Sequence, residues 1–157
     1  MLAAAVDATE GVRLFAPTET TVVCFTATDV DLFVLADELA ARDWHTQPQL
    51  SYGDLPPTIH LTVTAAVGPT AGQFGPDLAD AVAAARGRGP VELPSLPALT
   101  PDQVAPALVA GLADSLGLAG RDFGRMAGVN TVLNACPPAL REALLTGFLS
   151  LLQQAED

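Results

Sequence analysis

Two histidines and two cysteines are the side chains best suited to nucleophilic, acid–base or metal chemistry. His45 and His60 lack the spacing of a zinc site, and Cys24 and Cys136 form no CxxC pair. A catalytic zinc usually needs three clustered ligands, so we expect no metal site. Cys24 lies in the apolar run 22–25, where a buried, inert thiol is the usual interpretation. Cys136 precedes a proline pair at a predicted helix start, where the helix dipole would make the thiol mildly acidic.

The chain contains no lysine, and all seven of its basic residues are arginines. This excludes a P-loop, which needs a phosphate-binding lysine, and it excludes a lysine Schiff base. The sequence also lacks a GxGxxG phosphate loop and a GxSxG nucleophile elbow. A self-sufficient hydrolase using Cys24 or His60 is the weakest hypothesis, because neither residue has an evident partner. We therefore expect no catalytic residue in this chain.

The chain is strongly acidic, with 18 aspartates and glutamates and a formal net charge of −11. Such a field repels nucleic acid and anionic membranes, and no basic stripe offsets it. Residues 1–5 carry no basic charge before their apolar stretch, and the longest uncharged stretch, 55–76, is interrupted by prolines and glycines. We therefore expect a cytoplasmic protein with no membrane span and no nucleic-acid partner. Because 50% of its residues are hydrophobic, either the core is large for a chain of this length or part of the surface is covered by another domain.

Hydrophobic periodicity predicts an α/β (α+β) fold with the order β-β-α-β-β-α, followed by C-terminal helices. The small sheet is expected to be mixed or antiparallel, with helices covering one face. The predicted elements are a helix end at 1–10, strands at 12–15 and 20–28, a helix at 29–42, strands at 44–50 and 58–66, and helices at 74–86, 100–116 and 137–154. The β-branched run 20–28 suits a central strand, whereas Pro48 argues for an edge strand. Pro106 is expected to kink its helix.

Composition divides the chain into an α/β core at 1–87, a proline-rich connector at 88–100 and a helical extension at 101–157. The extension is expected to pack on the core. The three parts would then form one structural domain.

Two of the predicted strands each carry a polar face beside an apolar one. Residues expected beneath the helices are Trp44, Ile59, Leu61 and Val63, and those expected on the opposite face are His45, Gln47, Gln49, His60, Thr62 and Thr64. His60 is either a hydrogen-bonded sheet residue or part of a cleft closed by another domain, where imidazole could donate to a phosphate or carboxylate. Tyr52 is either a plain loop aromatic or a residue that reaches toward that cleft. Neutral hydrogen-bonding side chains suit a surface that loses water when another domain arrives.

A longer pattern is more specific. It comprises Thr28-Asp29-Val30-Asp31-Leu32-Phe33-Val34-Leu35, Arg42-Asp43-Trp44 and Pro56-Pro57-Thr58-Ile59-His60-Leu61. This pattern resembles the C-terminal small domain of fold-type-I pyridoxal-phosphate enzymes, in the branch of the group II decarboxylases and sphingosine-1-phosphate lyase. The resemblance is good over 12–86, weak over 123–152 and absent over 88–100. The family has glycine where this chain has Asp43; aspartate tolerates the left-handed conformation that such a helix end often needs, so we expect the turn to persist.

The resemblance implies a three-part enzyme, a decarboxylase or carbon–carbon lyase, whose large domain holds pyridoxal phosphate on a lysine. This chain would be the lid-like small domain, inactive alone, with His60 and Tyr52 as candidate residues facing the cleft. Such enzymes are homodimers with the site between subunits. A helix end at 1–10 and the high hydrophobicity fit a domain cut from that assembly. The alternative is a free-standing, non-enzymatic α/β module that binds a ligand or mediates dimerisation.

Overall fold

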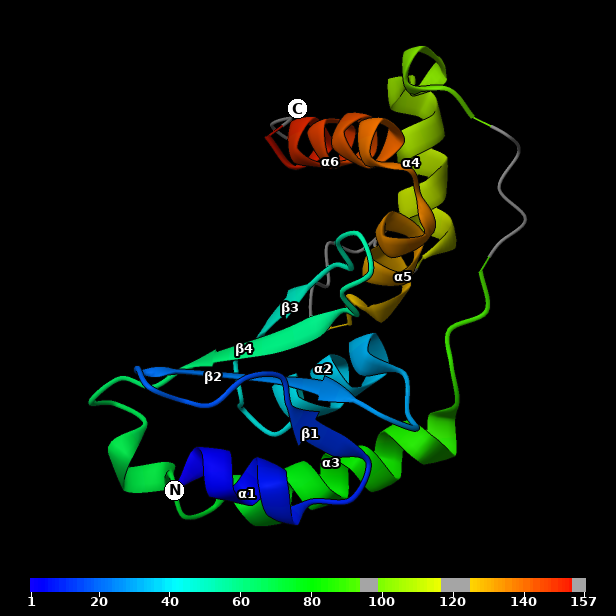
Figure 1. The fold of residues 1–157 in the computed structure, drawn as a ribbon. Helices are drawn as coiled ribbons and strands as arrows, with labels where there is room; N and C mark the ends of the chain where they lie inside the picture. The colour runs from blue at the N-terminus through cyan, green and yellow to red at the C-terminus, as the bar shows by residue number, and fades with distance from the viewer. Residues whose placement is uncertain (94–98, 117–124, 154–157) are drawn as a thin grey trace. The chain divides into compact units, whose positions relative to one another are not determined.

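The computed structural model describes residues 1–93, 99–116 and 125–153, with the backbone alone at Leu151 and Leu152 (Figure 1). The chain divides into two compact units, Met1–Val91 and Glu92–Asp157. The boundary falls in the proline-rich stretch 88–100, of which 94–98 lie outside the described residues. Among the helices that are described, none combines the length and the apolar character needed to cross a bilayer.

The first unit contains an antiparallel sheet and three α-helices, in the predicted order. Its elements are α1 (Leu2–Ala8), β1 (Val12–Leu14), β2 (Val22–Ala27), α2 (Leu32–Ala40), β3 (Gln47–Gln49), β4 (Thr58–Thr62), the 3-10 turn η1 (Gly68–Thr70) and α3 (Phe74–Arg88). The strand order is β1-β2-β4-β3, and every neighbouring pair is antiparallel. The predictions that β2 is interior and that β3, with its proline, is an edge strand are both confirmed. The strand predicted at 58–66 is too long, because β4 ends at Thr62 and a turn begins at Ala65.

One face of the sheet lies against α1, α2 and α3, and we call it the covered face (Figure 1). On this face Phe25 of β2 opposes Ile59 of β4, and both side chains are fully buried. Leu61 is buried as well, so the predicted register is correct. Full burial of such a side chain stabilises the fold by about 1.5–3 kcal/mol. The covered face is therefore the core of this unit.

The end of α2 turns the chain so that Trp44 enters this core. The N–H of Asp43 donates to the carbonyl of Ala40, and the N–H of Trp44 donates to the carbonyl of Leu39, both at 3.0 Å. These two bonds form a Schellman motif, which needs a left-handed residue after the helix. Asp43 supplies it with φ of +63°, the one positive φ outside glycine among the described residues. The turn expected at Asp43 is confirmed.

Trp44, in the segment between α2 and β3, connects that segment to α3. It is 7% exposed, and its ring packs edge-to-face on Phe74 with 4.9 Å between ring centroids. The indole N–H donates to the carboxylate of Asp77 at 2.8 Å. This bond, together with a second from Gln73, lowers the pKa of Asp77. The prediction that Trp44 is a core residue is confirmed.

A carboxylate on α2 forms a second link to α3. Glu38 accepts hydrogen bonds from Arg88 at 2.8 Å and from Arg42 at 3.1 Å. Burial raises the pKa of Glu38, but the two guanidinium groups outweigh it and lower the pKa below its ordinary value. Glu38 therefore stays ionised in a partly buried position and bridges the two helices.

The second unit is helical. Its described elements are the 3-10 turn η2 (Pro101–Gln103), α4 (Pro106–Ser115), α5 (Ala127–Ala135) and α6 (Pro138–Gln153). The single kinked helix predicted at 100–116 is wrong: the capping box of Thr100 and Gln103 closes only η2, and the chain then extends at Ala105. Pro106 occupies the first position of α4, where a missing N–H costs nothing. The sequence also did not predict α5.

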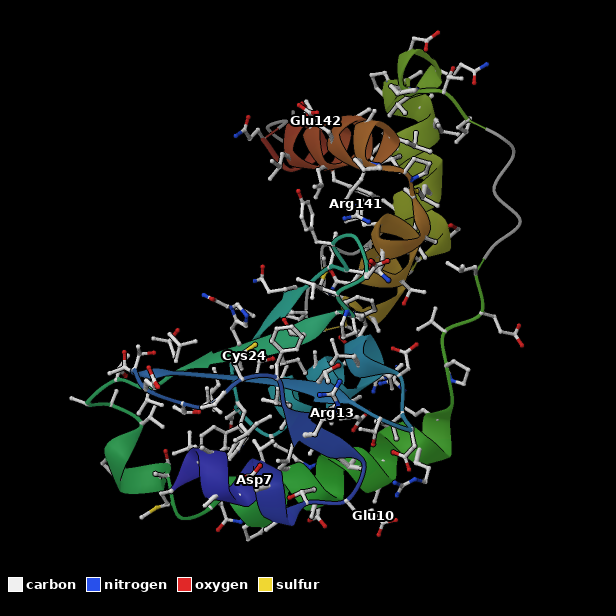
Figure 2. The ribbon with its side chains drawn as sticks, viewed as in Figure 1. Asp7, Glu10, Arg13, Cys24, Arg141 and Glu142 are labelled. Atoms are coloured by element: carbon white, nitrogen blue, oxygen red, sulfur yellow. The ribbon has the colours of Figure 1, made fainter. Side chains whose placement is uncertain are left out.

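The link between α5 and α6 is held by Arg141. Its guanidinium donates to the carbonyl oxygens of Leu133, Asn134 and Cys136 at 2.9–3.4 Å, which satisfies the otherwise unpaired end of α5 (Figure 2). Cys136 is buried, and that burial raises the pKa of its thiol despite the charge of Arg141. The mild acidity expected at Cys136 is therefore wrong, since desolvation outweighs any dipole effect.

Candidate functional site

The second face of the sheet is not covered by any helix of its own unit, all of whose residues, 1–91, are described. We call it the open face, and its strand residues are Arg13, Val22, Cys24, Thr26, Gln47, Gln49, Thr58, His60 and Thr62. Figure 2 shows Arg13 on β1 and Cys24 on β2, on the side away from α1 and α3. The sequence correctly predicted that Gln47 and Gln49 of β3 and His60 and Thr62 of β4 lie on this face. His45 and Thr64, predicted on the same face, lie just outside the strands and are exposed.

His60 lies at the centre of the open face and is half-buried. It opposes Cys24 on β2 and Gln47 on β3. The backbone bond from Val63 N–H to Thr21 O fixes which pairs of β2 and β4 exchange hydrogen bonds, and Cys24–His60 falls on a pair that does not. Side chains in such pairs approach most closely, with Cβ atoms about 4.5–5.5 Å apart. His60 and Cys24 are therefore immediate neighbours.

Cys24 is half-buried, not buried in the core as the sequence suggested. The run Val22–Ala27 is apolar enough to predict a strand buried on both faces. In the structure, however, Val23 and Phe25 point into the core, whereas Cys24 lies on the open face. The error arose because four consecutive apolar residues, 22–25, give no alternation from which the exposed face of the strand could be predicted. Only the pairing with β4 shows that Cys24 shares a face with His60.

Tyr52 lies apart from His60, at the tip of the loop between β3 and β4. Tyr52 and Leu55 exchange both backbone hydrogen bonds, at 3.0 and 3.2 Å, around a two-residue turn. Gly53 has φ of +56°, which suits the first central position of a type II′ turn. The ring of Tyr52 is 83% exposed, and Leu55 is 53% exposed beside it. The structure therefore places the two predicted site residues on different features, a strand centre and a loop tip.

Charge is distributed unevenly around the sheet. None of the four strands contains an aspartate or glutamate, although the chain has 18 such residues. The other arginines of this unit are engaged in ion pairs, namely Arg42 and Arg88 with Glu38 and Arg86 with Asp29. Arg13 is exposed and has neither an ion pair nor a side-chain hydrogen bond with any described residue. The open face thus combines neutral hydrogen-bonding groups with one unpaired cation.

The side chains of the open face are suited to binding another surface by hydrogen bonds. In the part of the chain that is described, no three His, Cys, Asp or Glu side chains gather closely enough to hold a metal ion. Pyridoxal phosphate does not fit as a covalently held group either, because the sequence offers no lysine to carry it. Amide, hydroxyl, imidazole and guanidinium groups instead suit hydrogen bonding to a second surface.

Comparison with known proteins concerns the helical unit. Residues 90–151 match a family model described as "Pyridoxal-dependent enzyme, C-terminal putative HTH domain". A search of curated proteins found no match. The match includes η2, α4, α5 and α6, and thus the residues where the resemblance read from the sequence was weak or absent. The helical unit of this chain is therefore similar to the C-terminal domain of pyridoxal-dependent enzymes.

Proposed function

We propose that this chain is the C-terminal part of a pyridoxal-phosphate-dependent lyase, in the branch of the group II decarboxylases and sphingosine-1-phosphate lyase. The large domain of that enzyme would hold the cofactor, and this chain would close the active-site cleft and support a cytoplasmic homodimer. The observation that carries the proposal is the family match over 90–151. The chain alone would have no activity, because it cannot supply the lysine that this chemistry needs.

Two separate parts of the chain support the same proposal. The motifs that resemble the decarboxylase branch lie in the α/β unit, within 12–86, whereas the family match lies in the helical unit. The two observations therefore rest on residues that do not overlap. The left-handed turn at Asp43 adds support, because the motif has glycine at that position and the backbone here adopts the conformation that favours glycine.

The open face is the part that we assign to the cleft. His60, half-buried in its centre, would donate a hydrogen bond to a phosphate or carboxylate group across the cleft. Tyr52 would contact the partner surface from the loop tip, where an exposed aromatic ring is typical of an interface anchor. His60 is thus the candidate that would affect turnover, and Tyr52 the candidate that would affect docking.

The helical unit would act in protein packing and not in nucleic-acid recognition. In α6, the last helix of the matched segment, the described residues include one basic side chain, Arg141. Arg141 is already bonded to the end of α5, and its neighbour Glu142 is exposed (Figure 2). A helix that reads DNA needs basic groups free to reach phosphates. We therefore propose a protein partner for this unit.

The free-standing module is the competing function, and it is favoured by the complete core of Met1–Val91. Sequencing the coding region distinguishes the two. Our proposal expects an open reading frame that continues upstream into a domain with a His-Lys motif. A stop codon directly upstream, with no lysine-bearing domain encoded beside it, would favour the free-standing module.

A chemical test complements the sequencing. The full-length protein, mixed with pyridoxal phosphate and reduced with borohydride, should carry a stoichiometric adduct on a lysine outside these 157 residues. The 157-residue chain treated in the same way should carry none on any side chain, as peptide mapping by mass spectrometry would show. An adduct on a side chain of the isolated chain would contradict the proposal.

A further inference from the structure

The unpaired arginine on the open face limits what can cover it. Arg13 opposes Thr26 on β2, and Thr26 lies two residues from Cys24, which opposes His60. Adjacent strands lie about 4.8 Å apart, so the guanidinium can reach over the middle of the face. The other open-face side chains are uncharged or imidazole, and such groups lose water at modest cost once they are hydrogen-bonded. A guanidinium does not: its burial requires a negatively charged partner.

The strands of the open face cannot supply that negative charge themselves. The strands contain no aspartate or glutamate, while the carboxylates of this unit lie on its helices and connecting loops. The apolar part of the face is small, with Val22 36% exposed and Phe15 half-buried next to Cys24. This composition, an arginine with aromatic and aliphatic groups, is typical of protein interfaces. It differs from a nucleic-acid surface, which needs many cations.

We infer that the open face receives a carboxylate-bearing surface of the enzyme's large domain, with Arg13 as the group that pairs with a partner aspartate or glutamate. The inference rests on the proposed function, since it names the chemistry of the partner in that assembly. A second copy of this chain, docked through its own open face, fits less well as the occupant, because the strands of that face contain no aspartate or glutamate to pair with Arg13. The pairing would orient the small domain on the large one and would weaken with salt.

The test uses the 157-residue chain and defined probes, so that it does not depend on pyridoxal phosphate or on the parent enzyme. Isotope-labelled chain is titrated, with NMR detection, with hexaglutamate, hexaglutamine and inorganic phosphate. We expect hexaglutamate to shift the resonances of Arg13 and its neighbours on β2 and β4. Hexaglutamine and phosphate should do so far less, and added salt should reverse the effect.

Two variants locate the interaction. Arg13→Gln should weaken hexaglutamate binding about two- to fivefold, the scale of one exposed ion pair. Arg86→Gln, the matched control, removes an arginine that is already paired with Asp29 on the helical side and should leave binding unchanged. Both arginines are exposed, so neither variant should unfold the unit.

The other outcomes are decisive against the inference. Equal binding of hexaglutamine would show that charge does not matter, and equal binding of phosphate would show a small-anion site. Shifts confined to the helices would show that hexaglutamate binds elsewhere and that the open face has no carboxylate site. None of these results would affect the upstream reading frame or the borohydride adduct, so a failure here leaves the proposed function standing.

Discussion

The covered and open faces of the sheet differ in how deeply their side chains are buried. Phe25 and Cys24 are adjacent in β2, yet Phe25 is fully buried and Cys24 is half-buried on the open face. The same alternation separates Ile59 from His60 in β4. The covered face holds the large apolar side chains of the α/β core, whereas the open face carries mainly hydrogen-bonding groups, of which Thr26 and Thr58 are buried. Substitutions of adjacent residues can therefore separate folding from function.

The largest expected effect is on the covered face. Phe25→Ala should lower the free energy of unfolding by about 3–5 kcal/mol, because it leaves a cavity beneath the helices. Cys24→Ala, the matched control one residue away, should cost less than about 1 kcal/mol. Chemical denaturation of the two variants measures both values. Equal losses would show that the two faces are equally important for stability.

The next effect concerns function on the open face. In the full-length enzyme, His60→Ala should lower turnover by about ten- to a hundredfold, which corresponds to about 1.4–2.7 kcal/mol of transition-state stabilisation. His45→Ala, beyond the edge strand, should change turnover little, and neither variant should alter the unfolding midpoint. If His60→Ala left both turnover and cofactor affinity unchanged, His60 would be a structural sheet residue.

A smaller effect is expected where α2 delivers Trp44 to the covered face. Asp43→Gly should raise the free energy of unfolding by about 0.5–1 kcal/mol, because glycine adopts φ of +63° without the steric cost that a Cβ carries. Asp43→Ala should change stability in the opposite direction, since alanine tolerates this conformation less well than aspartate. Thermal unfolding of the two variants checks the sign. A loss of stability in Asp43→Gly would contradict the assignment of the Schellman turn.

The smallest effect is a pH dependence. The folded-state pKa of Glu38 lies below its ordinary value of 4.5, so its contribution is present above that pH and is lost as the pH falls through the folded pKa. Between about pH 5 and pH 3, the free energy of unfolding of Glu38→Gln should therefore fall less steeply with acidification than that of the native chain. Arg88→Gln should reduce the same acid dependence, because it removes the hydrogen bond that holds the carboxylate ionised. Urea denaturation across this range measures both, and an unchanged slope in either variant would show that the Glu38–Arg88 pair is not the cause.

Local patterns predicted the α/β unit well. Alternation in β4 assigned Ile59, Leu61 and His60 to the correct faces, and a single proline identified β3 as the edge strand. Trp44 was correctly assigned to the core because it follows a helix end and has an apolar ring. These features depend on residues near one another in the chain, where steric and hydrophobic preferences are strongest.

The remaining features depend on contacts between distant residues. The exposure of Cys24 follows from which face the helices cover, and the pairing state of Arg13 follows from where the carboxylates of the helices lie. The segment of α5, Ala127–Ala135, contains Gly128 and two asparagines, so its helical propensity is weak and its packing against α6 stabilises it instead. Pro106 permits either a kink or a helix start, and only the extended Ala105 decides between them.

The position of Trp44 has a practical consequence for spectroscopy. It is the single tryptophan of the chain, and the single tyrosine, Tyr52, lies in the same unit. Tryptophan emission and near-ultraviolet dichroism from these two rings therefore report on Met1–Val91, whereas far-ultraviolet dichroism also detects α4, α5 and α6. The indole is hydrogen-bonded to Asp77 and lies against Phe74, so its emission should move to longer wavelength as soon as α2 and α3 separate. Denaturation curves recorded by tryptophan emission and by far-ultraviolet dichroism thus distinguish concerted unfolding of the two units from sequential unfolding, without any added label.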